Sequence, residues 1–121
     1  MMTPDQKFQR IAQALESGGN TLSVKDVIRG LEEGIYQIFD NDHGVCITRI
    51  CEGNGIRYLN CIVVAGELPG VMELHQQVED FGRANDCQWL ETTCRLGWEK
   101  VLPDYGWKKA RVVFVRELEH G

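Results

Sequence analysis

The chain has 121 residues and a formal net charge of −5, so it is one domain by length, and general binding to nucleic-acid phosphates is disfavoured. Hydrophobic residues make up 43% of the sequence and charged residues 26%, proportions typical of a globular domain with a modest core. The longest apolar runs, such as 61–66, are far too short to span a bilayer, and the first ten residues lack the apolar segment of a signal peptide. We therefore expect no membrane partner and a cytosolic location.

Two amphipathic helices are predicted at the start of the chain. Residues 4–17 place apolar side chains at helical spacing, and a Gly-Gly pair follows them. Ser23 is a suitable N-cap for the second helix, because Asp26 stands at the position of a capping box. Gly34 suits the left-handed residue that often follows the end of a helix.

Residues 35–65 change to strand-like patterns and predict an antiparallel meander. Strands are expected at 35–39, 45–51 and 56–65, and the dipeptide Asn54-Gly55 between the last two is a strong hairpin signal. The run 61–65 is apolar on both faces, which places the third strand at the centre of the sheet.

The rest of the chain predicts a helix, a strand, a short helix and a last strand. Pro69 suits the first turn of a helix that runs to about Ala84. Strands are expected at 88–92 and 111–118, with a short helix at 98–102 between them. The strand–helix–strand order makes the strand 88–92 parallel to the central strand.

The element order and several short motifs resemble the GNAT-type N-acyltransferase fold, in particular the small GNAT-like proteins of bacteriophages and prophages. The resemblance covers roughly 8–118. The matching residues are 15–21 with the Gly-Gly-Asn-Thr turn, 31–37 around Gly34, Ala84 with Cys87, the pair Leu90-Glu91, and Arg95-Leu96-Gly97-Trp98.

This resemblance implies a single GNAT-like domain over 1–121, with an α/β (α+β) fold in the order ααβββαβαβ. The expected architecture is a mixed, mostly antiparallel, twisted sheet of about five strands with helices on both faces.

The resemblance also implies where coenzyme A would bind. Acetyltransferases of this fold hold its pyrophosphate with a basic, glycine-rich loop after the central strand, where backbone N–H groups face the phosphate oxygens. Here Glu67 adds a negative charge to that loop and Pro69 removes a donor, so we expect no acetyl-CoA binding at tens of micromolar. The positions implied to contact the cofactor, if the chain is an enzyme, are Val64, Ala65, Gly66, Gly70, Val71 and Arg95.

The general acid of the family, usually a tyrosine, has no direct equivalent. Its position falls on Leu102, and Tyr105 is the nearest phenol, so Tyr105 is the catalytic candidate if the chain is an enzyme. Arg95 could hold a phosphate or a carboxylate.

Other reactive side chains have less specific settings. His75 could act as a base, although an exposed position on its helix is favoured. All three tryptophans, Trp89, Trp98 and Trp107, are expected to be core or corner packing residues and not ligand-stacking ones, and Trp98 and Trp107 are expected to be mostly buried. The five cysteines form no CxxC pair and the three histidines are scattered, so neither disulfides nor a metal site is predicted, and a reactive Cys94 is disfavoured.

Two functions follow from these patterns. The departures in the loop and at the general acid favour a phage-type GNAT-fold protein without catalysis, a virion-associated, assembly or protein-binding component in the host cytoplasm or the virion. Its partners would be proteins, including phage structural proteins, an oligomer is compatible with the sequence, and no cofactor is needed. The alternative is an acyl-CoA-dependent N-acetyltransferase that uses acetyl-CoA through an atypical pyrophosphate loop. A third hypothesis, an acidic inhibitor of a nucleic-acid enzyme, rests on charge alone.

Overall fold

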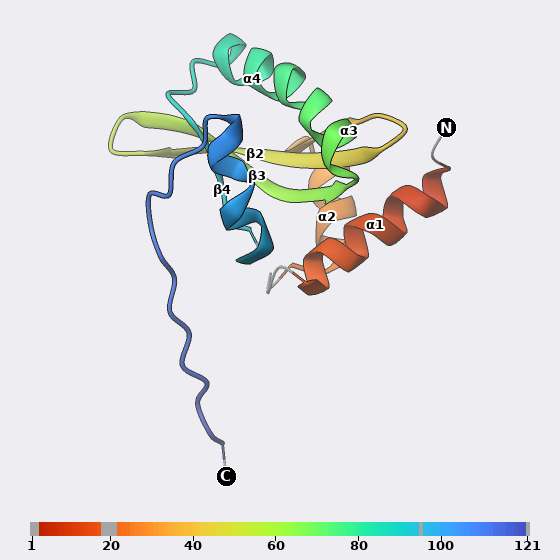
Figure 1. The fold of residues 1–121 in the computed structure, drawn as a ribbon, viewed down its shortest axis with the longest axis vertical. Helices are drawn as coiled ribbons and strands as arrows, with labels where there is room; N and C mark the ends of the chain where they lie inside the picture. Colours follow the sequence, from red (N-terminus) through yellow and green to blue (C-terminus); the bar gives the residue numbers. More distant parts are fainter. Residues whose placement is uncertain (1–2, 18–21, 95, 121) are drawn as a thin grey trace.

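The computed structural model describes residues 3–17, 22–94 and 96–120, which form a four-stranded sheet with helices on both of its faces (Figure 1). The elements, in chain order, are α1 (Pro4–Ser17), α2 (Val24–Glu32), β1 (Tyr36–Asp40), β2 (Gly44–Gly53), β3 (Ile56–Gly66), α3 (Leu68–Glu73), α4 (His75–Ala84), β4 (Leu90–Thr92) and the short 3₁₀ helices η1 (Leu96–Lys100) and η2 (Leu102–Tyr105). No helix within these ranges is long and apolar enough to cross a membrane.

The local signals at helix α2 and at the β2–β3 turn act as predicted. The Ser23 side chain accepts a hydrogen bond from the Asp26 backbone N–H, and the Asp26 carboxylate accepts one from the Ser23 N–H, which completes the capping box. These hydrogen bonds hold the pKa of Asp26 below its usual value. Asn54 and Gly55 have φ angles of 54° and 74°, the left-handed conformations that a two-residue type I′ hairpin turn requires.

The sheet has the order β1-β2-β3-β4, so β3 lies in its interior as predicted. Strands β1, β2 and β3 pair antiparallel. Strand β4 runs parallel to β3, with Leu59 opposite Leu90 and Cys61 opposite Thr92. The expected fold class, a mixed and mostly antiparallel sheet with helices on both faces, is confirmed.

One irregularity in β3 divides the core between the two faces of the sheet. Ile47 pairs with Val63, but Thr48 pairs with Cys61, so Ile62 is an extra residue in β3 and forms a β-bulge. Because side chains alternate along a strand, the extra residue transfers the buried positions to the opposite face. Two buried clusters result. On one face, Val63 and Ala65 pack with residues of α1 and α2, namely Ile11, Leu15 and Val27. On the other face, Leu59 and Cys61 pack with Leu74, which precedes α4, and with Val78 of α4.

Three elements differ from the sequence prediction. The single helix expected from Pro69 to Ala84 is divided at Leu74 into α3 and α4. The short helix expected at 98–102 is replaced by η1 and η2.

The strand expected at 111–118 does not form. Residues 107–120 have no regular structure, and the chain leads away from the sheet (Figure 1). Strand-forming side chains alone do not make a strand, because the backbone also needs a neighbouring strand for its hydrogen bonds. The described sheet therefore has four strands where about five were expected.

Candidate functional site

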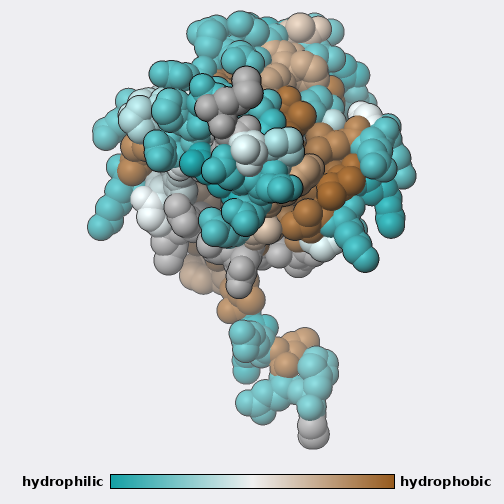
Figure 2. Space-filling view, turned by 90° about the vertical axis from the view of Figure 1, so that its right-hand side faces the viewer, coloured by the Kyte–Doolittle hydropathy of each residue, from teal (hydrophilic) through white to brown (hydrophobic). Residues whose placement is uncertain are grey.

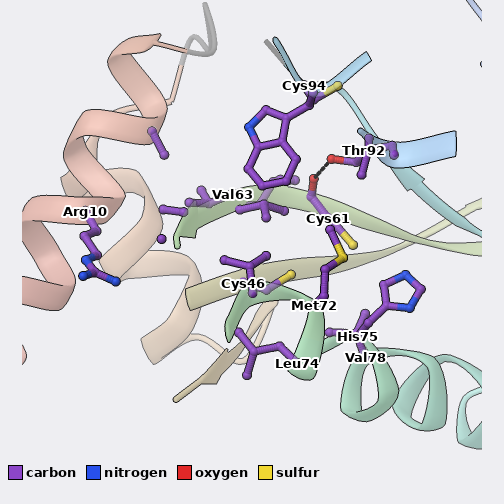
Figure 3. A pocket seen from close by; sticks show the side chains of 18 of the residues that line it. Arg10, Cys46, Cys61, Val63, Met72, Leu74, His75, Val78, Thr92 and Cys94 are labelled. Carbon is purple, nitrogen blue, oxygen red and sulfur yellow. Dashed lines mark hydrogen bonds between the residues drawn. The ribbon is translucent and has the colours of Figure 1, made fainter. Parts of the chain in front are cut away.

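A cavity of about 470 Å³ lies where β3 and β4 separate (Figure 3). Pairing between the two strands ends at Cys61 and Thr92, whereas β3 continues to Gly66, so the two strands part beyond this point. Residues 62–67 of β3 and the loop after it line one side of the cavity, and 92–94 line the other. The remaining walls come from α1, α3 and α4 and from the aromatic residues Trp98 and Trp107.

The floor of the cavity is formed by uncharged sulfur-containing side chains. Cys46 and Cys61 are both buried, and Met72 lies beside them (Figure 3). A hydrogen bond with the Cys61 thiol, together with burial, raises the pKa of the Cys46 thiol well above its usual range. Thr92 Oγ1 donates a hydrogen bond of 3.1 Å to the Cys61 carbonyl oxygen and ties β4 to the floor. This surface suits an apolar or thioester-bearing group better than a charged one.

His75 forms part of the cavity wall and is held by two partners. Trp107 Nε1 donates a hydrogen bond of 3.0 Å to His75 Nε2, and Glu79 Oε1 lies 3.2 Å from His75 Nδ1 on the next turn of α4. The Trp107 bond requires a lone pair on Nε2, so the hydrogen of the neutral ring is on Nδ1 and points to Glu79. A carboxylate at Nδ1 and a basic Nε2 at a cavity are the arrangement of a general base.

The sequence-based expectation that His75 is exposed is wrong, because its side chain is 27% exposed and lines the cavity. A signal for this position is present in the sequence. His75 follows Val71 by four residues and precedes Val78 by three, which is the spacing of the buried helical face.

Arg10 brings a positive charge to the opposite end of the cavity (Figure 3). Its guanidinium donates a hydrogen bond to the His43 carbonyl oxygen, which also accepts one from the Glu67 N–H, so Arg10 lies beside the loop between β3 and α3. A guanidinium has five N–H donors and can bind an anion through those that remain. The sequence-based argument missed Arg10 because it considered only cations close to that loop in sequence.

Gly66 at the end of β3 and Gly70 in α3 make room for the turn between β1 and β2. Gly66 has a φ of +130°, and a Cβ atom there would overlap with the His43 carbonyl oxygen. A Cβ atom at Gly70 would overlap with the His43 side chain, and the Gly70 carbonyl accepts a hydrogen bond of 2.7 Å from Asn41 Nδ2. Both glycines therefore have a packing role in this structure.

The cavity brings together some of the predicted site residues. Val64, Ala65, Gly66 and Val71 line it, whereas Gly70 does not. Tyr105 lies outside the lining and is 45% exposed, while Leu102, at the family's general-acid position, lines the cavity. Arg95 lies outside the described residues.

The tryptophans differ in their burial. Trp98 and Trp107 are mostly buried, as predicted, and both line the cavity. Trp89 is 44% exposed and stacks on Tyr58 with ring centroids 5.4 Å apart.

The remaining candidate groups are cysteine thiols. Desolvation raises the pKa of Cys94, which argues against a thiolate there. All five cysteines are free, and no cluster of metal-ligating side chains is found among the described residues.

No protein-family model and no curated protein matches the sequence, but solved structures match the fold. A probable acetyltransferase matches 97% of this chain and 91% of its own with a TM-score of 0.66 and 13% identity. Glucosamine-6-phosphate N-acetyltransferase from Arabidopsis thaliana matches 93% of this chain and 92% of its own with a TM-score of 0.61 and 10% identity. An aminoglycoside acetyltransferase from an uncultured soil sample matches 93% of this chain and 89% of its own with a TM-score of 0.63 and 10% identity. At these identities the likeness shows the fold, which is of the GNAT acyltransferase type.

The packing of His43 against the loop predicts the effect of Gly66→Ala. The new methyl group meets the His43 carbonyl oxygen, and the positive φ disfavours alanine, so the free energy of unfolding should fall by more than about 1 kcal/mol. Gly53→Ala is the matched control, because a Cβ atom there would meet nothing within 4 Å beyond its own chain neighbours, and it should change stability by less than about 0.5 kcal/mol. Urea unfolding measures both, and equal effects would contradict this account of Gly66.

Proposed function

We propose that the chain is an acyl-CoA-dependent N-acyltransferase with an atypical pyrophosphate loop. The observation that carries the proposal is the cavity between the diverging strands β3 and β4, with His75 in its wall and Glu79 in contact with that histidine. The shared fold with structures described as acetyltransferases supports it. This was the alternative in the sequence-based interpretation.

The cavity fits the acyl and pantetheine part of such a donor. Its volume of about 470 Å³ lies within the range of small-molecule sites. Beyond Cys61 the backbone of β3 borders the cavity, and an extended chain that carries amide groups can hydrogen-bond to a strand in the manner of an added strand. The residues in contact would be Val63, Val64 and Ala65, above the neutral floor formed by Cys46 and Cys61.

The phosphate end of the donor has a weaker fit. Arg10 supplies one fixed positive charge, whereas Glu67 supplies a negative one beside it. We therefore propose Arg10 as the phosphate contact that replaces a basic loop, with an affinity below that of a loop of bare backbone donors.

The residues of the cavity can perform proton transfer for amide formation. The bound thioester supplies an electrophilic carbonyl carbon and a thiol leaving group. The amine of the acceptor takes the place of the Trp107 indole at His75 Nε2 and gives its proton to that nitrogen as the new C–N bond forms. Glu79 would stabilise the resulting imidazolium through Nδ1–H, and that imidazolium would pass the proton from Nε2 to the sulfur as the C–S bond breaks, so that the products are the amide and the free thiol and His75 is neutral again.

A second candidate is a non-catalytic protein-binding component, including a phage virion or assembly component. The observation in its favour is that His43 packs against the glycines at the cofactor loop, where the resemblance implied phosphate binding. The two candidates differ in whether acetyl transfer occurs at all.

The role of His75 is tested by acetyl transfer from acetyl-CoA to a panel of primary amines. The rate of transfer is measured as the release of the free thiol. His75→Ala should lower kcat by about 10²–10⁴-fold with a small change in KM for acetyl-CoA. His120→Ala, in the exposed C-terminal tail, is the matched control and should have the activity of the wild type. Absence of transfer to every amine would favour the non-catalytic candidate, whereas full activity of His75→Ala would show that His75 is not the base.

The role of Arg10 is tested by calorimetric titration of the same donor. Arg10→Gln should raise the Kd for acetyl-CoA by about tenfold or more, because a charge-assisted contact to phosphate is lost. Arg29→Gln, on the exposed surface of α2, should leave the Kd unchanged. S-acetylpantetheine, which has no phosphate, should bind the wild type and Arg10→Gln equally, and an equal loss for both ligands would show that Arg10 only supports the fold.

A further inference from the structure

The C-terminal arm, residues 111–118, presents a row of large apolar side chains to solvent. Phe114 is 92% exposed, and Val112, Val113, Val115 and Leu118 are each more than half exposed. The arm leads away from the sheet in Figure 1 and stands clear of the main body in Figure 2, where hydrophobic and hydrophilic residues are interspersed along it. A folded domain rarely leaves so much contiguous apolar surface without a partner.

The arm has the sequence of a β-strand. Val112 to Val115 are β-branched or aromatic residues, which favour extended pairing, and charged residues flank them at both ends. Within the described structure this segment has no neighbouring strand, although its composition predicts one. A strand from another chain can meet that need through backbone hydrogen bonds.

The sheet offers a matching edge at β4. Strand β4 is the last in the order β1-β2-β3-β4, so its outer side pairs with no strand among the described residues. Backbone hydrogen bonds from Gln88 N–H to the Arg57 carbonyl and from Leu59 N–H to the Trp89 carbonyl extend the contact with β3 beyond β4 itself. The edge therefore runs over 88–92, which is long enough to pair with the apolar part of the arm.

The base of the arm is fixed beside this edge. Arg111 forms an ion pair with Glu91 of β4, and the chain then turns away from its own sheet. The arm therefore lies clear of its own β4, whereas a second copy related by a two-fold axis would present its β4 edge to the arm. If each copy places its arm on the β4 edge of the other, both arms and both edges are paired, and the two contacts are identical by symmetry.

We propose that two copies of this chain form a dimer by exchanging their arms, each arm adding a strand to the β4 edge of the other copy. Residues 92–94, which follow this edge, line the cavity, so the exchanged arm would hold one wall of the cavity in place. The proposal does not depend on acyl transfer, because it rests on the arm and the edge alone.

Light scattering of the full chain tests the exchange. The protein concentration should be about 50 μM, because this lies well above the Kd of a typical specific dimer. The wild type should have twice the chain mass of 13.8 kDa. The double substitution Val112→Glu and Phe114→Glu should give the monomer mass. Ile35→Glu is the matched control, because Ile35 is 50% exposed but lies outside the arm, and it should remain dimeric.

Hydrogen exchange of the backbone amides in 88–92 distinguishes a second copy from the chain's own arm. Exchange in the wild type should be slower than in the double variant by about tenfold or more, together with the dimer mass. A wild-type monomer in which 88–92 are protected by the arm would place the arm on its own sheet and overturn the proposal. A wild-type monomer without that protection, a mass other than that of the dimer, or a dimer that survives the double substitution would also overturn it.

Discussion

The β-bulge at Ile62 determines how the rest of the structure is arranged. Before it, Leu59 and Cys61 face the α3–α4 layer, and after it Val63 and Ala65 face the α1–α2 layer. A bulge also bends its strand and increases its twist. Pairing with β4 ends one residue before the bulge, and the cavity opens directly beyond it. The same irregularity therefore supplies a core to each face of the sheet and separates the parallel strands that form the site.

The groups that give the cavity its chemistry come from distant parts of the chain. Arg10 reaches it from α1, His75 from α4, where Glu79 contacts the histidine ring, and Trp107 from beyond η2. Gly66 and Gly70, at the end of β3 and in α3, pack against His43, and the positive charge at this end of the cavity comes from Arg10 of another element. A binding site can keep its place in a fold while the side chains that serve it change.

The sequence predicted the features that depend on short-range chemistry. The capping box at Ser23, the Asn54-Gly55 turn and the central position of β3 follow from neighbouring residues or from an apolar run. The cavity wall was harder to predict, since the bond from Arg10 to His43 spans 33 positions and the bond from Trp107 to His75 spans 32. The arm was predicted as a strand because its side chains favour one, but whether a strand forms depends on a partner that local sequence does not specify.

Amide hydrogen exchange with and without acetyl-CoA tests the central claim, that the opened edge of β3 receives an acyl donor. At saturating acetyl-CoA the account predicts slower exchange of the amides in 62–66, with no comparable change in β1, which lies at the far edge of the sheet. Protection confined to other segments, or no protection at millimolar acetyl-CoA, would contradict it.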